Sequence, residues 1–232
     1  MLNVNGLHSF DLTPAEAREL QGELASRVSV GPSLDLEDIR YVAGADVSTE
    51  DESAYATVVV LDFPGLSVVE VQGFEAPLTF PYVPGLLAFR EIPSVVGALE
   101  KVESPVDAIV FDAQGLAHPR RMGLASPMGL FIDVPAIGCA KSRLVGEYEE
   151  PAAEKGSTTD LVHRGEVIGK VLRTRMNVSP VYVSVGNGID LESAVELVLA
   201  CCPRYRLPET TRQAHKTANE LRTGGEPGRT LF

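Results

Sequence analysis

The sequence has little that would direct the protein to a membrane or an oxidising compartment. It contains no apolar run of the roughly 18 residues that a membrane-spanning helix needs. The first residues, MLNVNGLHSF, lack a basic start followed by an apolar stretch, so we expect no secretory signal. The cysteines Cys139, Cys201 and Cys202 are odd in number and lack metal-ligand spacing, which predicts thiols in a reducing cytoplasm.

Basic residues are few, and they are unevenly distributed. With 44% hydrophobic and 22% charged residues, the composition is that of a folded globular protein. The net charge of −12 argues at first against a nucleic-acid partner. However, residues 1–117 carry 5 basic and 19 acidic side chains, whereas residues 118–232 carry 15 basic and 13 acidic. The second half can therefore supply a local basic surface.

The hydrophobic patterning predicts a single α/β domain over residues 1–232, built on a mixed sheet. Helices are expected at 12–28, 85–100 (kinked or split by Pro93), 122–131, 190–201 and 208–223. Strands are expected at 41–48, 56–62, 66–74, 107–112, 136–141, 157–163, 166–174 and 181–185. The first three form an antiparallel meander, and the strand–helix–strand unit over 107–141 predicts parallel neighbours. Residues 224–232 are expected to form a flexible tail.

Three carboxylates lie where apolar residues would be expected. Asp46 interrupts the strand YVAGADVS, Asp112 ends the strand DAIVFD, and Glu91 lies on the apolar helix GLLAFREIP. A carboxylate buried alone is costly, so each should be paired, hydrogen-bonded or bound to a cation. If the strands of Asp46 and Asp112 are neighbours, the cluster would suit Mg²⁺ or Mn²⁺, which take oxygen ligands.

Several basic side chains could complete such a site. Lys141 ends the apolar strand AIGCAK, where it would either neutralise a scissile phosphate or extend to solvent. His118 and His215 are candidate ligands, although a lone histidine is as often structural. The remaining cations could hold flanking phosphates or lie in solvent: Arg120, Arg121 and Arg143.

The stretch TFPYVPGLL has two prolines that bracket Tyr82 and Val83. Two prolines this close stiffen a loop, and a rigid apolar tip can act as a wedge that parts stacked bases. In the alternative interpretation, Tyr82 packs on the protein core.

Taken together, the blocks VAGADVS, PYVPGLLAFRE, VFDAQGLAHPRRMGLAS, IGCAKSRL, PVYVSVGNGID and TRQAH resemble the endonuclease V family in their order and spacing. The resemblance covers about residues 8–221. It implies a ribonuclease H-like fold with a central mixed five-stranded sheet flanked by helices. It also implies Mg²⁺-dependent hydrolysis of the second phosphodiester bond 3′ to deoxyinosine, leaving 3′-hydroxyl and 5′-phosphate ends, with Mn²⁺ as a possible substitute.

The resemblance assigns roles to residues at matching positions. The metal carboxylates would be Asp46, Glu91 and Asp112, joined in catalysis by Lys141 and His215. The strand-separating wedge would be Pro81, Tyr82, Val83 and Pro84. Contacts to DNA would come from His118, Arg120 and Arg121. The pocket for the displaced base would be formed largely by the backbone around Gly85, Leu87, Ala113, Gly123 and Leu144.

Two positions depart from the family pattern. Ala113 stands where glycine is usual, and Pro127 stands where histidine is common. Both departures concern substrate range and rate more than reaction type. Two alternatives remain open, an inosine-directed ribonuclease acting on RNA and a catalytically silent nucleic-acid-binding module. We expect a monomer, because no large apolar helix face remains once the core is assigned.

Overall fold

The structure is a computed structural model that describes residues 2–225. Its helices are α1 (Pro14–Ala25), α2 (Leu87–Leu99), α3 (Ala125–Phe131), α4 (Leu191–Ala200) and α5 (Glu209–Arg222). Its strands are β1 (Tyr41–Glu50), β2 (Ser53–Asp62), β3 (Val68–Pro77), β4 (Ala108–Phe111), β5 (Ala136–Ala140), β6 (Thr158–His163), β7 (Glu166–Leu172) and β8 (Val181–Asn187). Most of the expected tail, residues 226–232, lies outside the described residues.

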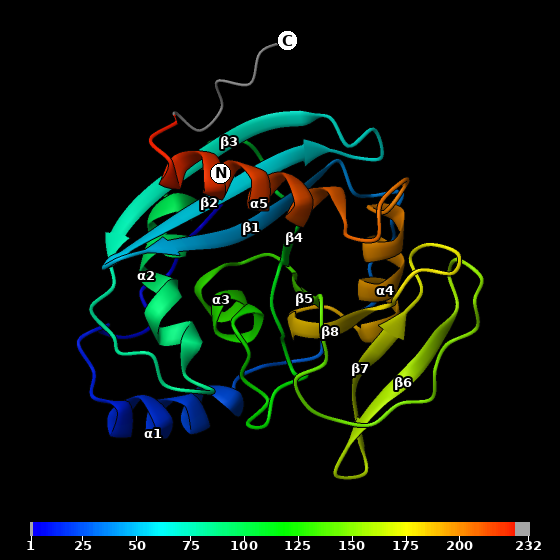
Figure 1. Cartoon of the computed structure of the whole chain (residues 1–232), viewed down its shortest axis with the longest axis horizontal. Helices are drawn as coiled ribbons and strands as arrows, with labels where there is room; N and C mark the ends of the chain where they lie inside the picture. The colour runs from blue at the N-terminus through cyan, green and yellow to red at the C-terminus, as the bar shows by residue number, and fades with distance from the viewer. Residues whose placement is uncertain (1, 226–232) are drawn as a thin grey trace.

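All eight strands belong to one mixed sheet, in the order β3-β2-β1-β4-β5-β8-β7-β6 (Figure 1). The expected antiparallel meander is present in β1, β2 and β3, and β4 lies parallel to both β1 and β5. The sheet is larger than the five-stranded central sheet that the resemblance implies, which corresponds to β3-β2-β1-β4-β5. Because β8 pairs antiparallel with β5 and offers its other edge to β7, the hairpin of β6 and β7 extends the same sheet.

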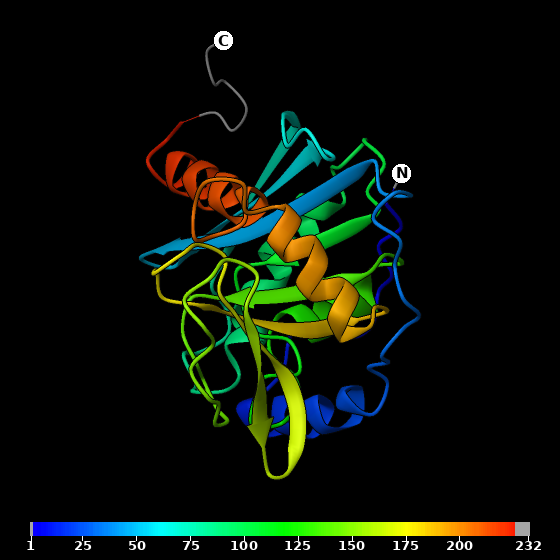
Figure 2. The same cartoon turned by 90° about the vertical axis from the view of Figure 1, so that its right-hand side faces the viewer.

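Helices cover both faces of this sheet (Figures 1 and 2). Side chains alternate along a strand, so Val110 packs with the core under α4 and α5, while its neighbours Ile109 and Phe111 pack with the core under α2 and α3. None of the helices among residues 2–225 is long and apolar enough to cross a membrane.

Local sequence signals explain where two of the helices begin. Thr13 and Glu16 form a reciprocal capping box at the start of α1, and Asp190 accepts hydrogen bonds from the backbone at the start of α4. Pro93 lies inside one continuous α2, so it does not split the expected second helix. Its neighbours Ile92 and Val95 are buried in the core, and this packing holds the helix together across the missing backbone donor.

The arrangement of β1, β4 and β5 defines the functional edge of the sheet. Because these strands are parallel, their carboxyl ends lie at one edge. Helix α5 crosses β1 so closely that a Cβ on Gly44 would lie 2.2 Å from the backbone oxygen of Thr210. Thr57 on β2 then donates to the Ala214 carbonyl at 2.8 Å, which anchors the middle of α5 over the strands.

Candidate active site

Asp46 and Asp112 meet at this sheet edge, together with His215 from α5. One possible ligand atom from each of the three lies within 4.8 Å of the others. The two aspartates come from the neighbouring parallel strands β1 and β4, and His215 reaches them because α5 is anchored over β1. Two carboxylates and an imidazole form an oxygen-rich donor set that fits a hard divalent cation such as Mg²⁺.

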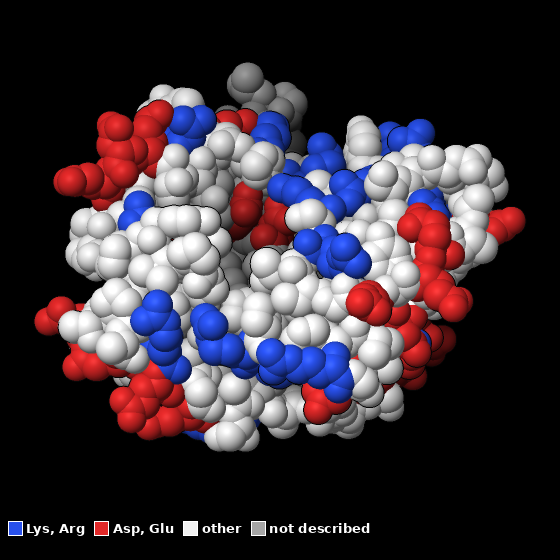
Figure 3. Space-filling model, turned by 60° about the horizontal axis from the view of Figure 1, so that its bottom comes forward, with Lys and Arg blue, Asp and Glu red and all other residues white. Residues whose placement is uncertain are grey.

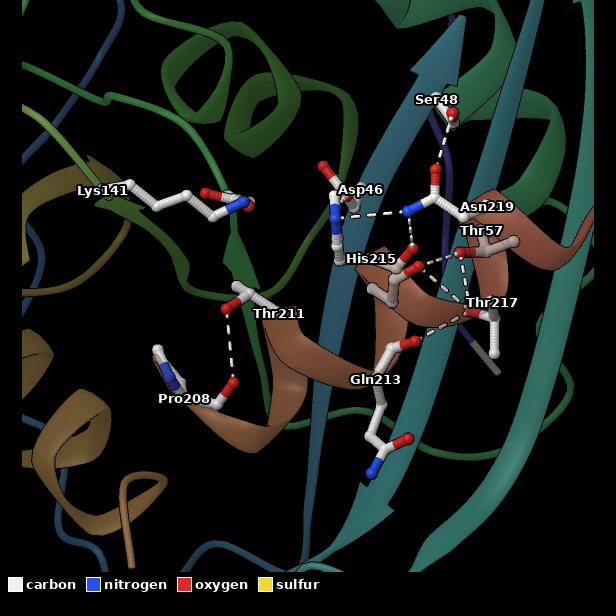
Figure 4. A network of polar contacts seen from close by, with 12 residues as sticks. Asp46, Ser48, Thr57, Lys141, Pro208, Thr211, Gln213, His215, Thr217 and Asn219 are labelled. Carbon is white, nitrogen blue, oxygen red and sulfur yellow. Dashed lines mark hydrogen bonds and ion pairs between the residues drawn. The ribbon is translucent and has the colours of Figure 1, made fainter. Parts of the chain in front are cut away.

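The orientation of His215 is set by hydrogen bonds on both sides of its ring (Figure 4). The amide nitrogen of Asn219 lies 3.2 Å from Nε2, and Nδ1 is hydrogen-bonded to Oδ2 of Asp46 at 2.6 Å. Asn219 is itself held by the hydroxyl of Ser48, which donates to it at 3.1 Å. Burial, and then the Asp112 carboxylate, raise the pKa of Asp46, while the bond from His215 opposes that rise.

Lys141, at the end of β5, forms an ion pair with Asp112. The Asp112 side chain is only 7% exposed, whereas that of Lys141 is 40% exposed. The ammonium group therefore neutralises a nearly buried carboxylate and still faces the open side of the site. Figure 4 shows the lysine approaching from the side opposite to His215.

Glu91 on α2 contributes to the site from a greater distance. It is not part of the cluster of Asp46, Asp112 and His215, but it lines the same cavity. Burial is the main effect that raises the pKa of Glu91 to about 7, and repulsion from Asp46 adds to it. The expected set of three carboxylates is thus present as a close pair with a third acid on the cavity wall.

These residues lie in a cavity of about 630 Å³. Its walls also include every residue expected at the base pocket: Gly85, Leu87, Ala113, Gly123 and Leu144. Three of the four expected wedge residues line it as well, namely Tyr82, Val83 and Pro84. Residues that the sequence assigned to metal binding, phosphate binding and base recognition therefore share one continuous space.

Tyr82 stands clear of the protein surface. Its side chain is 72% exposed, whereas Phe80, two residues earlier, is 3% exposed and packs against Phe89. The alternative interpretation, in which Tyr82 packs on the core, is therefore wrong. Phe80 anchors the loop and leaves the tyrosine at its tip.

A second cavity of about 580 Å³ adjoins the first. Lys141, Ser142 and Arg143 line both of them, and Arg173 and Arg206 add two further cations to the second. Figure 3 shows acidic atoms at the bottom of a hollow with basic side chains beside it. Cations thus gather next to the carboxylates although the whole chain carries a net charge of −12.

Three residues expected to touch DNA are engaged within the protein. His118 is 4% exposed, and burial, followed by repulsion from two arginines, lowers its pKa to about 4, so it is neutral. Arg121 forms an ion pair with Glu166 at 2.8 Å. Arg120 donates to the Gly85 carbonyl at 2.7 Å. These partners are distant in sequence, so the local pattern AHPRR does not reveal them.

Three residues that support the site were not predicted from the sequence. Asn219 lies four positions after His215 on the same helical face, a spacing that predicts contact. Gln21 stands between Ala17 and Leu24 in the buried stripe of α1, where a polar residue signals a specific partner. Arg206, which donates to the Lys141, Ser179 and Pro180 carbonyls, has no comparable signal in the sequence.

Comparisons with known proteins point to one family. The family described as Endonuclease V matches residues 22–216. An endonuclease V of Dehalococcoides mccartyi is 51% identical over 222 residues, which are 95% of this chain and 99% of that protein. The crystal structure of the Streptomyces avermitilis endonuclease V is similar with a TM-score of 0.88 and 41% identity, over 96% of this chain and 98% of that one. A Ciona intestinalis endonuclease V in complex with inosine-containing DNA has a TM-score of 0.81 and 28% identity, over 92% and 99% of the two chains.

The raised pKa of Glu91 predicts a pH-dependent stability of the metal-free protein. The carboxyl has a reference pKa of 4.5 and a folded value of about 7, so between these values the folded state retains a proton that the unfolded state has lost. This stabilising contribution is complete below the lower value and disappears as the pH rises through about 7. Urea unfolding in a chelator should show stability falling over this window, with a shallower fall in Glu91→Gln. An identical slope in that variant would contradict the assignment, and Glu100→Gln, exposed at the end of α2, is the matched control.

Proposed function

The chain belongs to the endonuclease V family, and we propose that it recognises deoxyinosine in DNA and cuts the strand nearby with the aid of Mg²⁺. The bond hydrolysed is the second phosphodiester 3′ to the lesion, and the products carry 3′-hydroxyl and 5′-phosphate ends. The observation that carries this proposal is the shared cavity, in which Asp46, Asp112 and Lys141 face the same space as the exposed Tyr82. The Ciona relative bound to inosine-containing DNA supports the choice of substrate.

The base pocket suits recognition by backbone groups. The turn over 113–123 is so tightly packed that a Cβ on Gly115 would lie 2.1 Å from the Val185 oxygen, and one on Gly123 would lie 2.2 Å from the Gln114 oxygen. The lack of side chains at these two glycines therefore lets the turn pack closely and leaves the backbone of Gly123 at the cavity wall. Ala113 fits this arrangement because it packs against the apolar core under α2 and α3. A base can enter such a pocket only after leaving the duplex, and a mismatched inosine costs less to extract.

The catalytic side of the cavity suits phosphodiester hydrolysis. Asp46, Asp112 and His215 would hold the cation, and Glu91 faces the same cavity. A bound Mg²⁺ supplies an activated water and stabilises the leaving oxygen. Asn219 keeps the His215 ring in place, and Lys141 presents an ammonium group from the end of β5 that a phosphate oxygen can share.

The second cavity offers a path for the DNA strand beyond the cut. Arg206 is fixed by three carbonyl acceptors, and Arg143 lies over the ring of Tyr148. These guanidinium groups are thus ordered before any strand arrives, which reduces the entropy lost on binding. The acidic remainder of the surface repels polyanions elsewhere and favours this one approach. We further propose that the protein acts as a monomer in the cytoplasm, where its three buried cysteines remain thiols.

Cleavage of defined oligonucleotides tests the activity. With Mg²⁺, the purified protein should nick a duplex that contains one deoxyinosine and spare the unmodified duplex. Electrophoresis beside a sequencing ladder should place the cut at the second phosphodiester bond 3′ to the deoxyinosine. Inosine-containing RNA run in parallel decides between the two substrate classes. Equal cutting of modified and unmodified DNA would contradict base-specific cleavage. Faster cutting of inosine-containing RNA than of deoxyinosine-containing DNA would favour the ribonuclease alternative.

Replacing one metal carboxylate should separate chemistry from binding. Asp46→Asn removes a charged ligand but no base contact, so we expect cleavage to fall by about 10³-fold while affinity for deoxyinosine DNA changes little. Single-turnover rates and fluorescence anisotropy of labelled DNA measure the two quantities. Asp51→Asn, exposed in the turn between β1 and β2, is the control with the same chemical change. Unreduced cleavage would refute the metal role of Asp46.

The exposed tip of the loop should matter for discrimination. Tyr82→Ala removes the ring that would fill the space of the displaced base, and since stacking contributes about 1–3 kcal/mol per base, we expect the cleavage ratio of modified to unmodified duplex to fall about tenfold. Tyr82→Phe keeps the ring and should retain most of the ratio. Tyr205→Ala, another exposed tyrosine outside the first cavity, is the control. An unchanged ratio in Tyr82→Ala would exclude the wedge role.

A further inference from the structure

Gln21 is a fully buried polar residue on α1, with 0% of its surface exposed. It lies in the stripe of the helix that faces the protein, between Ala17 and Leu24. A buried amide must find hydrogen-bond partners, or it destabilises the fold. Its partners come from segments that are far away in the sequence.

Gln21 and Arg120 converge on the same backbone groups. The Gln21 amide nitrogen donates to the Gly85 carbonyl at 3.0 Å and to the Met122 carbonyl at 3.1 Å. Its oxygen accepts a hydrogen bond from Nε of Arg120. Nη2 of Arg120 donates at 2.7 Å to the same Gly85 carbonyl. The two side chains thus form one unit, which we term the Gln21–Arg120 clamp.

The clamp joins the two parts of the cavity that would handle the base. Gly85 directly follows the loop 81–84, and Met122 precedes Gly123 in the turn 113–123; all three residues line the cavity. Gln21 and Arg120 do not line it. They can affect a bound base only through the backbone that they hold.

Gly85 shows how closely the clamp fits. Its φ of +79° lies in the left-handed region, which favours glycine, and a Cβ there would lie 2.6 Å from Nη2 of Arg120. Gly85, the residue that directly follows the loop, therefore combines an unusual backbone conformation with direct contact to the clamp.

We propose that Gln21 and Arg120 are positioning residues for base discrimination. They hold the wedge loop at a set distance from the base pocket, so selectivity depends on a helix that does not reach the cavity. This inference rests on the proposed function. It also changes the role of Arg120, which the sequence suggested as a phosphate contact. In the free protein, its guanidinium is committed to Gln21 and Gly85.

The fold of this region does not depend on the clamp alone. Apolar packing of Ala17, Phe80, Leu86 and Phe89, with Leu20 and Val83 beside them, already holds α1 to the loop. Gln21→Met keeps the length of the side chain and removes its hydrogen bonds. We therefore expect the variant to fold, with a loop that is less tightly held.

The chain contains no tryptophan, so Tyr82→Trp places a unique fluorescent reporter at the loop tip. Adding Gln21→Met or Arg120→Leu to this reporter protein should lower the tryptophan anisotropy and increase quenching by acrylamide, without DNA present. In the parent with Tyr82, each substitution should lower the cleavage ratio of deoxyinosine to unmodified duplex by about fivefold, the effect of about one lost hydrogen bond. Gln72→Met, on β3 at the sheet edge, is the control.

The outcomes separate the clamp from its alternatives. Unchanged anisotropy and quenching in both variants would overturn the proposal. So would a phosphate-contact pattern, in which Arg120→Leu weakens binding of modified and unmodified DNA equally, lowers the salt dependence and leaves the reporter unchanged. If the parent protein shows no preference for deoxyinosine, the proposed function fails, and the reporter measured without DNA still decides whether the clamp holds the loop. Should Gln21→Met not fold, the exposed Arg120 provides the same test.

Discussion

Repulsion between two nearly buried carboxylates is the constraint around which the sheet edge is built. Asp46 and Asp112 lie together because β1 and β4 are parallel neighbours in which Ala45 pairs with Phe111, so the residue after each comes to the same level. In water-poor surroundings two such charges destabilise the fold unless cations or hydrogen-bond donors face them. Lys141 faces one and His215 the other, and each comes from a different element. The arrangement is therefore poised to accept a divalent cation, which relieves the same repulsion.

This constraint explains why parts of the fold far from the cavity are so closely fitted. His215 can reach Asp46 only if α5 lies directly on β1, and Gly44 permits that approach by having no side chain. The Thr57 hydroxyl then bonds to the helix backbone and to the hydroxyl of Thr217, both of them buried. Buried polar contacts of this kind contribute modestly to stability, but they select one placement of the helix. The position of His215 is thus set by the packing of α5 against the sheet.

The sequence predicts the catalytic side of the site better than the recognition side, for a physical reason. A carboxylate at the end of an apolar strand is a local signal, and parallel neighbouring strands are enough to bring Asp46 and Asp112 together. No local signal shows that Arg120 and Arg121 are occupied by partners 35 to 99 positions away. The same limit applies to the sheet: each strand was recognisable, but the continuation through β8 to β7 and β6 depends on pairing between distant segments. Pro93 remained in one helix because buried neighbours outweighed its local effect.

The two sides of the cavity differ in how they are held, and this difference bears on what the family fold can vary. The catalytic side is built from strand ends in the middle of an eight-stranded sheet, where a shift of one residue would disturb pairing on both sides. The recognition side is built from a loop and a turn that are joined by Gln21 of α1. Ala113 lies where the two sides meet, directly after Asp112. It packs against the core under α2 and α3 and also lines the cavity, so the departure from glycine adds a methyl group that this core contacts. On the roles proposed for the two sides, substitutions on the recognition side would alter which base is accepted and leave the hydrolytic chemistry in place.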